Sequence, residues 1–205
     1  LPAERLLQAK VLGTLPHHRL RGKAVTLLET MHQKNALSGD DQFFLARLLM
    51  QQGKDSANWA KARGILKALT LAHPKNPRYL AYLAQQQIAR NEHQEAETVL
   101  VRLEAVERER KATSGGFGSI ELRAKLAEQR GLGTQAVTLL TDYAAQPGAA
   151  PARKLLVAHL HGRLGNFREA IDWCEQAREH EGLAHEANAA AVALLRMNRP
   201  SEAQS

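Results

Sequence analysis

Residues 151–182 read PARKLLVAHLHGRLGNFREAIDWCEQAREHEG, and this stretch decides the fold. Its apolar residues recur at helical spacing on both sides of a Gly165-Asn166 stop, and Gly182 ends the unit. A connection this short forces two helices to run antiparallel, so the stretch predicts an αα-hairpin. The apolar residues are Leu155, Leu156, Val157, Ala158 and Leu164 before the stop, and Phe167, Ala170, Ile171, Cys174 and Ala177 after it.

The same spacing recurs along the chain. A small residue is followed after seven positions by Gly or Asn, and after five more by Ala. Gly and Asn tolerate the left-handed backbone that ends a helix, and Ala lets paired helices approach closely. Two earlier units fit less tightly: Ala46–Gly53–Ala62, and one that ends at Ala24 with Arg19 in the stop position. The four regular units are Ala84–Asn91–Ala96, Ala124–Gly131–Ala136, Ala158–Gly165–Ala170 and Ala191–Asn198–Ala203.

The second-helix alanines lie at 24, 62, 96, 136, 170 and 203, which gives intervals of 38, 34, 40, 34 and 33 residues. This pattern resembles the tetratricopeptide repeat (TPR) family, whose period is 34 and whose motif includes A-x3-F followed by Pro. The resemblance covers nearly the whole chain, and a helical-repeat family with longer or looser units is the alternative. The residues that carry it are Ala62, Leu66 and Pro74, the pairs Ala96/Leu100, Ala136/Leu140 and Ala170/Cys174, and Leu45-Ala46, Leu83-Ala84 and Val157-Ala158 where the family has Leu-Gly.

The resemblance implies an all-α fold, a right-handed superhelical solenoid of antiparallel helix pairs with about five to six repeats. We expect residues 1–205 to form one TPR-like domain, a piece of a longer protein, because the chain starts at Leu1 and Pro200–Ser205 reads as the opening turn of a helix. The predicted helices are 3–14, 19–34, 40–53, 57–72, 77–90, 93–111, 119–131, 133–146, 151–164, 167–180, 184–197 and a beginning at 200.

Composition supports the helical reading. The chain has 34 Ala and 31 Leu but only 12 Val and Ile together, and β-branched residues are those that favour strands. It has no apolar run near the ~20 residues that cross a bilayer, which excludes a transmembrane protein. Its single cysteine, Cys174, excludes an internal disulfide and any metal site built of cysteines alone. A cytoplasmic location is favoured.

The excess positive charge lies in the first third of the chain. Residues 1–76 hold 12 Lys and Arg against 5 Asp and Glu, whereas residues 77–205 hold 16 of each. The densest stretch has no acidic residue between Glu4 and Glu29, and it offers a second function, binding of nucleic acid or another anionic surface. Residues 1–42 contain no aromatic for stacking on bases, which weakens the nucleic-acid interpretation. The basic residues are Lys10, Arg19, Arg21 and Lys23, with His17 and His18.

No motif in the chain indicates an enzyme, a cofactor or a metal site. His180 and His185 are five residues apart with Gly182 between them, and His159 and His161 point away from each other on one helix. The Gly-rich stretch 112–118, with Phe117, follows a helix and lacks the Gly-Lys-Ser/Thr of a phosphate loop, so it is expected to be a linker. Cys174 is expected to be buried and inert. Trp59, Trp173 and Tyr143 are interpreted as packing residues.

The resemblance implies that the first helix of each repeat lines a concave groove that binds a peptide or protein segment. The types Arg, Tyr, Phe and Met concentrate binding energy, and the cations Arg47, Arg78 and Arg163 favour an acidic partner. The Lys and Asn pairs with which one subfamily clamps a carboxylate are absent, since that row holds Phe43, Ala81, Glu121 and Leu155. The function expected is therefore a non-catalytic interaction scaffold. The candidate residues are Phe43, Phe44, Arg47, Met50, Arg78, Tyr82, Gln85, Glu121, Lys125, Glu128, His159, Arg163, Asn188 and Arg196.

Overall fold

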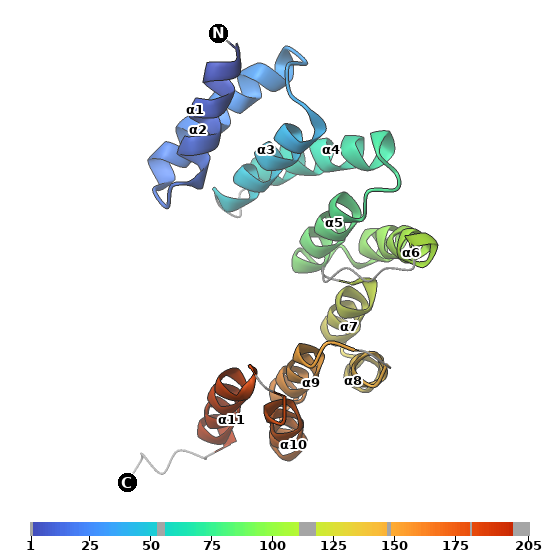
Figure 1. The fold of residues 1–205 in the computed structure, drawn as a ribbon. Helices are drawn as coiled ribbons and strands as arrows, with labels where there is room; N and C mark the ends of the chain where they lie inside the picture. The colour runs from blue at the N-terminus through green and yellow to red at the C-terminus, as the bar shows by residue number, and fades with distance from the viewer. Residues whose placement is uncertain (1, 53–55, 111–117, 147–148, 181, 199–205) are drawn as a thin grey trace. The chain divides into compact units, whose positions relative to one another are not determined.

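The computed structural model describes residues 2–52, 56–110, 118–146, 149–180 and 182–198, and these residues form helices joined by short connections (Figure 1). No strand occurs among them. None of their helices is both long and apolar enough to span a membrane. The helices are α1 (Pro2–Thr14), α2 (His18–Gln33), α3 (Gly39–Gln51), α4 (Ser56–Ala72), α5 (Pro77–Ala89), α6 (His93–Arg110), α7 (Ser119–Gln129), α8 (Gly133–Ala144), α9 (Ala152–Arg163), α10 (Phe167–Arg178) and α11 (Ala184–Asn198).

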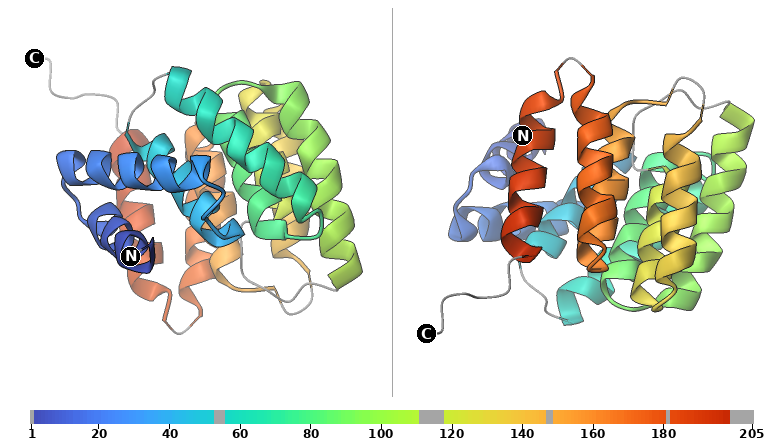
Figure 2. Two further views of the ribbon diagram at one scale, coloured as in Figure 1. Left: turned by 90° about the horizontal axis from the view of Figure 1, so that it is seen from above. Right: turned by 90° about the horizontal axis from the view of Figure 1, so that it is seen from below.

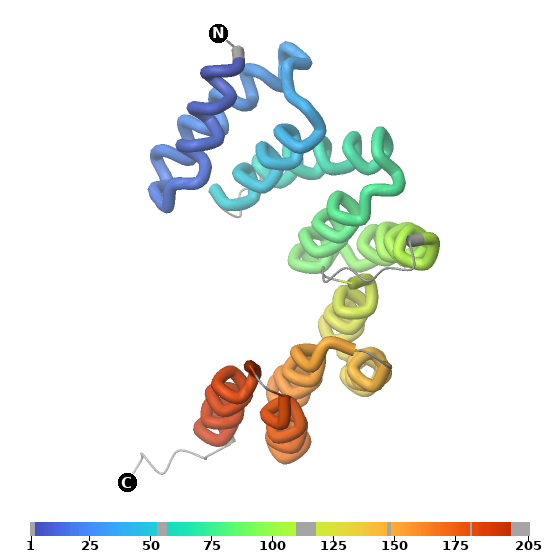
Figure 3. Tube along the Cα trace, viewed as in Figure 1, coloured from blue at the N-terminus to red at the C-terminus, as the bar shows by residue number. Residues whose placement is uncertain are grey.

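The predicted helices are confirmed throughout the described part of the chain. Each one from 3–14 to 184–197 has its counterpart, with both ends within two residues of the predicted positions. Figure 3 follows the same path as a tube. The predicted helix start at 200, the stop at Gly53, the alanine at 203 and the stretch 112–117 lie outside the described residues.

Three of the predicted helix stops adopt left-handed backbone, whereas Asn198, predicted as a fourth, is the last residue of α11. Asn91, Gly131 and Gly165 have φ values of 59°, 76° and 81°. Each is followed by an amide that donates back across the last helical turn, as in Asn166 N to His161 O at 2.9 Å, which satisfies carbonyls that the helix leaves free. Asn35, after α2, has φ 51° and the same bond pattern.

The stop assigned to Arg19 is wrong. Arg19 lies in the first turn of α2, and the connection between α1 and α2 is 15–17. His17 is the last residue before the helix, with an extended backbone, and its carbonyl accepts from the Leu20 and Arg21 amides at 3.1 Å each. The first repeat therefore turns without the left-handed residue that ends α5, α7 and α9.

The small residues of the repeat pattern are in the core. The five second-helix alanines within the described residues have no exposed surface, which confirms that the helices meet at them. Four of the first-helix alanines are also buried, whereas Ala191 on α11 is half-buried. A methyl group at these points lets two backbones approach where a larger side chain would separate them. The second-helix alanines are Ala24, Ala62, Ala96, Ala136 and Ala170.

The contacts divide the chain into two compact units. Unit 1 contains residues 1–86 and 101–112, and unit 2 contains residues 87–100 and 113–205. In unit 1, α1 packs on α2, α2 on α3 and α3 on α4. In unit 2 the sequence of packed neighbours runs from α7 through α8, α9 and α10 to α11, and Figure 2 shows α10 and α11 side by side.

The core of unit 2 contains two apolar clusters that share one aromatic residue. The first cluster joins α7, α8 and α9 through residues such as Leu140 and Leu160. The second joins α9, α10 and α11 and includes Cys174 and Leu194. Trp173 packs against both clusters, so its ring connects successive repeats and confirms its predicted packing role.

Candidate binding surface

The start of α3 is fixed by a pair of carboxylates with different partners. Ser38 caps the helix by accepting the Asp41 amide at 3.3 Å, and its hydroxyl donates to Asp41 Oδ2 at 2.6 Å. Lys10 on α1 reaches Asp41 Oδ1 at 2.7 Å. Burial acts to raise the pKa of Asp41, but the hydrogen bonds from Lys10 and Ser38 and the Lys10 charge outweigh it and hold the pKa below its ordinary value.

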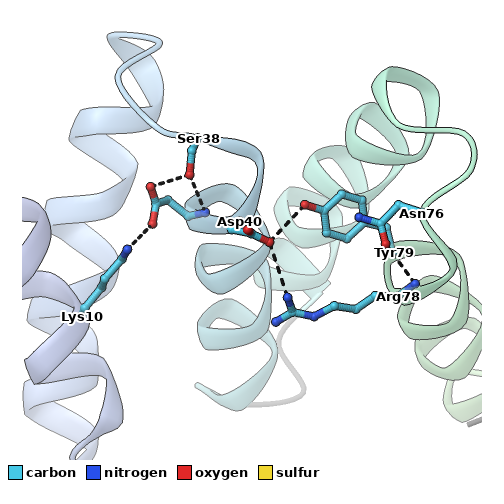
Figure 4. Close-up of polar contacts among 7 residues, drawn as sticks. Lys10, Ser38, Asp40, Asn76, Arg78 and Tyr79 are labelled. Atoms are coloured by element: carbon cyan, nitrogen blue, oxygen red, sulfur yellow. Dashed lines mark hydrogen bonds and ion pairs between the residues drawn. The ribbon is translucent and has the colours of Figure 1, made fainter. Parts of the chain in front are cut away.

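Asp40, the neighbouring carboxylate, connects α3 to α5 instead (Figure 4). Its Oδ1 accepts from the Tyr79 hydroxyl at 3.3 Å and lies 3.4 Å from Arg78 Nη1. Asn76 accepts the Arg78 amide at 3.1 Å and so caps the start of α5. Burial, followed by the Asp40 charge, raises the pKa of Tyr79. Two adjacent acidic residues thus attach α3 to α1 and to α5, the first helices of the preceding and the following repeat.

An aromatic cluster lies beside this network. The Phe43 ring centroid is 5.1 Å from that of Tyr79 and 5.2 Å from that of Tyr82, with the Tyr82 ring edge-on. The Arg78 guanidinium lies 4.6 Å from the Phe43 centroid, within the range of a cation–π contact. Phe43 is only 3% exposed. Phe43, one of the candidate binding residues, therefore cannot contact a partner directly, because neighbouring side chains cover its ring. It supports the residues above it.

The accessible residues around Phe43 form what we call the α3–α5 face, defined by Arg47, Met50, Tyr82 and Gln85. Arg47 is exposed and the other three are half-buried. Burial raises the pKa of Tyr82, and the nearby Arg47 charge acts in the opposite direction. Arg47 has no carboxylate partner among the described residues, in contrast to Arg78, which faces Asp40. The face combines this cation with an aromatic, a thioether and an amide.

Unit 2 presents a more polar set. Lys125 on α7, His159 on α9 and Asn188 on α11 are exposed. Arg163 donates to Glu128 through two nitrogens, at 2.6 and 2.9 Å, in a forked ion pair between α9 and α7. Two of the candidate residues thus neutralise each other. Of the remaining candidates, Phe44 and Glu121 are half-buried and Arg196 is exposed.

One position of the repeat is accessible to solvent in every described repeat that has a first-helix alanine. The residue directly after this alanine is exposed or half-buried, although the alanine itself is in the core or at its edge. A step of one residue turns about 100° around a helix, which carries the side chain out of the contact with the next helix. The residues at this position are Arg47, Gln85, Lys125, His159 and Val192.

The basic stretch near the N-terminus is partly used within the fold. Lys10 is paired with Asp41, and Arg21 is half-buried with one nitrogen 3.5 Å from the Pro16 carbonyl. Arg19 and Lys23 are exposed on α2, and the rings of His17 and His18 stack with centroids 5.5 Å apart. Only part of the basic charge counted in the sequence is therefore available to a partner.

Cys174, Trp59 and Tyr143 all make packing contacts, as the sequence predicts. Cys174 is buried, and burial raises the pKa of its thiol, which keeps it protonated and unreactive. Trp59 is buried, and Tyr143 stacks under the Arg153 guanidinium at 3.7 Å. Within the described ranges, no group of three or more His, Cys, Asp or Glu side chains is placed to hold a metal ion.

Sequence reasoning missed the network of Asp40, Asn76 and Tyr79, which aligns α3 and α5. A signal was present: Ser38 followed three residues later by Asp41 is a capping-box pattern, and Asn76 stands before a proline. The partner of Asp40 had no local signal, because Asp40 and Tyr79 are 39 residues apart.

Solved structures of other proteins show which fold this chain has. No family model matches the sequence, and no curated protein matches it. A thermophilic TPR protein of Thermus thermophilus has a similar structure, with a TM-score of 0.65 and 18% identity over 96% of this chain and 100% of that one. MamA MSR-1 C2 gives 0.54 and 15% over 86% and 92%, and a mutant of MamA gives 0.51 and 15% over 86% and 93%. The chain is therefore a TPR-like, all-α helical-repeat protein in its fold.

Proposed function

We propose that this protein is a non-catalytic scaffold that binds a protein segment with acidic residues along the exposed faces of its first helices. The TPR-like fold supports the general role, since helical repeats of this kind expose extended surfaces made of successive first helices. The segment would lie in the groove that the family resemblance predicts.

The repeat position after the first-helix alanine carries the proposal. It is accessible in each described repeat and holds Arg47, Gln85, Lys125 and His159 before it becomes Val192 in α11. A position that is accessible in successive repeats lets each repeat offer a side chain to a partner from the same place on its first helix. Arg47 and Lys125 have no carboxylate partner among the described residues, so their charges are available to an acidic segment.

The α3–α5 face adds the apolar contact that such binding needs. Tyr82 is half-buried over Phe43, and Met50 lies one turn beyond Arg47 on the same side of α3. Aromatic and Met side chains with a rigid support lose little conformational freedom on binding, which is why they concentrate binding energy. Arg163 contributes less than its charge suggests, because Glu128 already occupies its donors.

A peptide array tests the proposal. Acidic peptides with one aromatic or aliphatic residue are compared with basic and scrambled ones, and the affinity of selected peptides is measured by fluorescence anisotropy. We expect Arg47→Glu with Lys125→Glu to weaken binding at least tenfold. The matched control is Lys67→Glu with Arg168→Glu, two exposed cations on the second helices α4 and α10. Equal loss in both double variants, or no selected peptide, contradicts the proposal.

The single variants locate the binding residues further. Loss in Arg47→Glu alone assigns the segment to the α3–α5 face, and loss in Lys125→Glu alone assigns it to unit 2. Tyr82→Ala then separates charge from contact area, because this change removes an aromatic ring and leaves Arg47 in place. Circular dichroism of each variant verifies that its helical content is unchanged.

A further inference from the structure

Three exposed apolar residues lie along α1 and the connection that follows it. Leu7, Val11 and Leu15 are 64%, 54% and 39% exposed. Leu7 and Val11 are four residues apart on one side of α1, opposite the side that contains buried Ala9, and Leu15 follows directly after the helix ends at Thr14. We call these three residues the α1 stripe. The exposed residues beside it, such as Gln8 and Lys10, are polar.

A cluster of positive charge follows directly. The turn between α1 and α2 and the first turns of α2 expose His17, His18, Arg19 and Lys23, which we call the basic turn. The sequence has no acidic residue between Glu4 and Glu29 to neutralise it. Leu15 is two residues from His17 in the chain, so the α1 stripe ends next to the basic turn, at the end of the hairpin where the chain passes from α1 to α2 (Figure 3).

The N-terminus of α2 has neither a side-chain cap nor a nearby acidic side chain in its own first turn. In α3, by contrast, Ser38 caps the helix, and Asp40 and Asp41 lie in its first turn. The Leu20 and Arg21 amides of α2 already donate to the His17 carbonyl, whereas the His18 and Arg19 amides before them need acceptors from outside the helix. At α2 a phosphate group supplied by a partner would meet these amides together with the side chains of the basic turn.

We propose that this surface binds an anionic phospholipid bilayer, with the α1 stripe in the interface and the basic turn on the lipid phosphates. The inference is independent of the proposed scaffold function, since it uses none of the α3–α5 face. A helix with an apolar side and adjacent cations lies in the membrane interface and depends on both acyl contact and anionic headgroups.

The combination of features favours a bilayer over other anionic partners. A nucleic acid would use the cations but has no use for Leu7 and Val11, and residues 1–42 provide no aromatic for stacking. A protein partner requires roughly 800 Å² from each side in a stable complex. The α1 stripe is one side chain wide, and a fluid lipid interface accepts such a row without a matching shape.

Vesicle sedimentation with the full chain tests the inference. The probes are vesicles of phosphatidylcholine alone and of phosphatidylcholine with phosphatidylglycerol, each at low and high salt. We expect binding only to the anionic vesicles, and weaker binding at high salt, because salt screens exposed charges. A cation near an anionic surface contributes about fivefold in affinity, so Arg19→Gln with Lys23→Gln should weaken binding about 25-fold.

The α1 stripe has its own variant and control. Leu7→Gln with Val11→Gln should weaken binding to anionic vesicles about tenfold. Leu195→Gln with Met197→Gln changes two apolar residues on α11 that are 49% and 63% exposed, and it should leave binding unchanged. Absence of binding to anionic vesicles overturns the proposal, as does an equal effect of the control.

Binding to a duplex DNA tests whether the basic turn binds nucleic acid instead of lipid. The DNA is used at the same concentration of negative charge as the anionic vesicles. The lipid proposal is overturned if the protein binds DNA, shows no preference for anionic vesicles, and loses DNA affinity only when the cations are changed. In that case Arg19→Gln with Lys23→Gln weakens DNA binding, whereas Leu7→Gln with Val11→Gln leaves it unchanged. The basic turn would then be assigned to nucleic acid. Loss of peptide binding by the α3–α5 variants has no bearing on this result, so the two proposals fail separately.

Discussion

First helices of successive repeats meet in different ways in the two units. In unit 1, α3 and α5 meet through Phe43, Tyr79 and Tyr82, with Asp40 joined to Tyr79 and Arg78. In unit 2, α9 and α11 meet where Gly162 faces Leu194, and α7 and α9 are joined by Glu128 and Arg163. Both units bury alanines at the same repeat positions.

The difference shows which residues set the backbone and which set the surface. The alanines are buried at matching positions in both units, and left-handed residues end α5, α7 and α9 in the same way. The residues around them vary, and they decide whether an inter-repeat contact is aromatic and charged or small and aliphatic. The contact between Phe43 and Tyr82 leaves part of the Tyr82 ring accessible to solvent. The contact between Gly162 and Leu194 leaves little side-chain surface accessible. Four experiments challenge this distinction, in order of decreasing expected effect.

The largest effect should come from the shared alanines, which ought to behave alike in both units. Ala62→Trp in unit 1 and Ala170→Trp in unit 2 place an indole where no surface is exposed. We expect each to lower the free energy of unfolding by about 1–3 kcal/mol or more, because overpacked helices must move apart. Urea denaturation measures the loss. Ala68→Trp, at an exposed position of α4, is the control and should be close to neutral.

The Asp41 contact belongs to unit 1 alone and should make its stability sensitive to acid. The native pKa of Asp41 lies below its ordinary value, so its stabilisation is complete above the unfolded pKa and is lost as pH falls through the lower native pKa. Asp41→Asn should cost about 1–2 kcal/mol at neutral pH by weakening the cap and the Lys10 contact. Helicity measured over a descending pH series should then show a smaller acid-dependent loss than in the parent chain.

Two glycines distinguish aromatic from aliphatic contacts. A Cβ on Gly13 would lie 2.7 Å from Phe44 Cζ and 2.9 Å from Leu48 Cδ1, but Phe44 is only half-buried, so its ring has room to move. A Cβ on Gly162 would overlap Leu194 Cδ2 more closely, and Leu194 is 5% exposed within the core cluster of α9, α10 and α11. We expect Gly162→Ala to destabilise by about 1 kcal/mol because Leu194 is confined, and Gly13→Ala to destabilise less because Phe44 can yield and alanine favours the helix. Equal shifts in thermal melting would contradict the distinction.

The smallest effect should come from the exposed ion pairs, which both units contain. Arg163→Gln removes the forked contact with Glu128, and Lys61→Gln removes a 2.7 Å contact with Glu29 in unit 1. Exposed pairs contribute about 0.2–1 kcal/mol, and salt screens them. Melting curves at low and high salt should therefore differ from the parent only at low salt. A large loss that persists at high salt would show that the side chains act through packing.

The candidate residues show how far sequence reasoning reaches at a surface. The family resemblance named Arg47, Lys125 and His159 as exposed groove candidates, and all three are exposed. It gave no indication that Phe43 would be covered by Tyr79 and Tyr82, or that Arg163 would be neutralised. Accessibility at one position follows from helical geometry, but the partner of Arg163 comes from another repeat, 35 residues away along the chain.

The sequence by itself determined the helices, the stops at Asn91, Gly131 and Gly165 and the alanines buried between helices, because periodicity, Gly or Asn at left-handed turns and Ala at close contacts act over a few neighbouring residues. Ala136 and Ala170 needed no structure to be assigned to the core. Only the tertiary structure decided which charges are free. Asp41 captures Lys10, Asp40 binds Tyr79, and Glu128 holds Arg163, leaving Arg47, Lys125 and the basic turn without such a partner among the described residues. These pairings join side chains from different repeats, and their geometry exists only once the helices have packed.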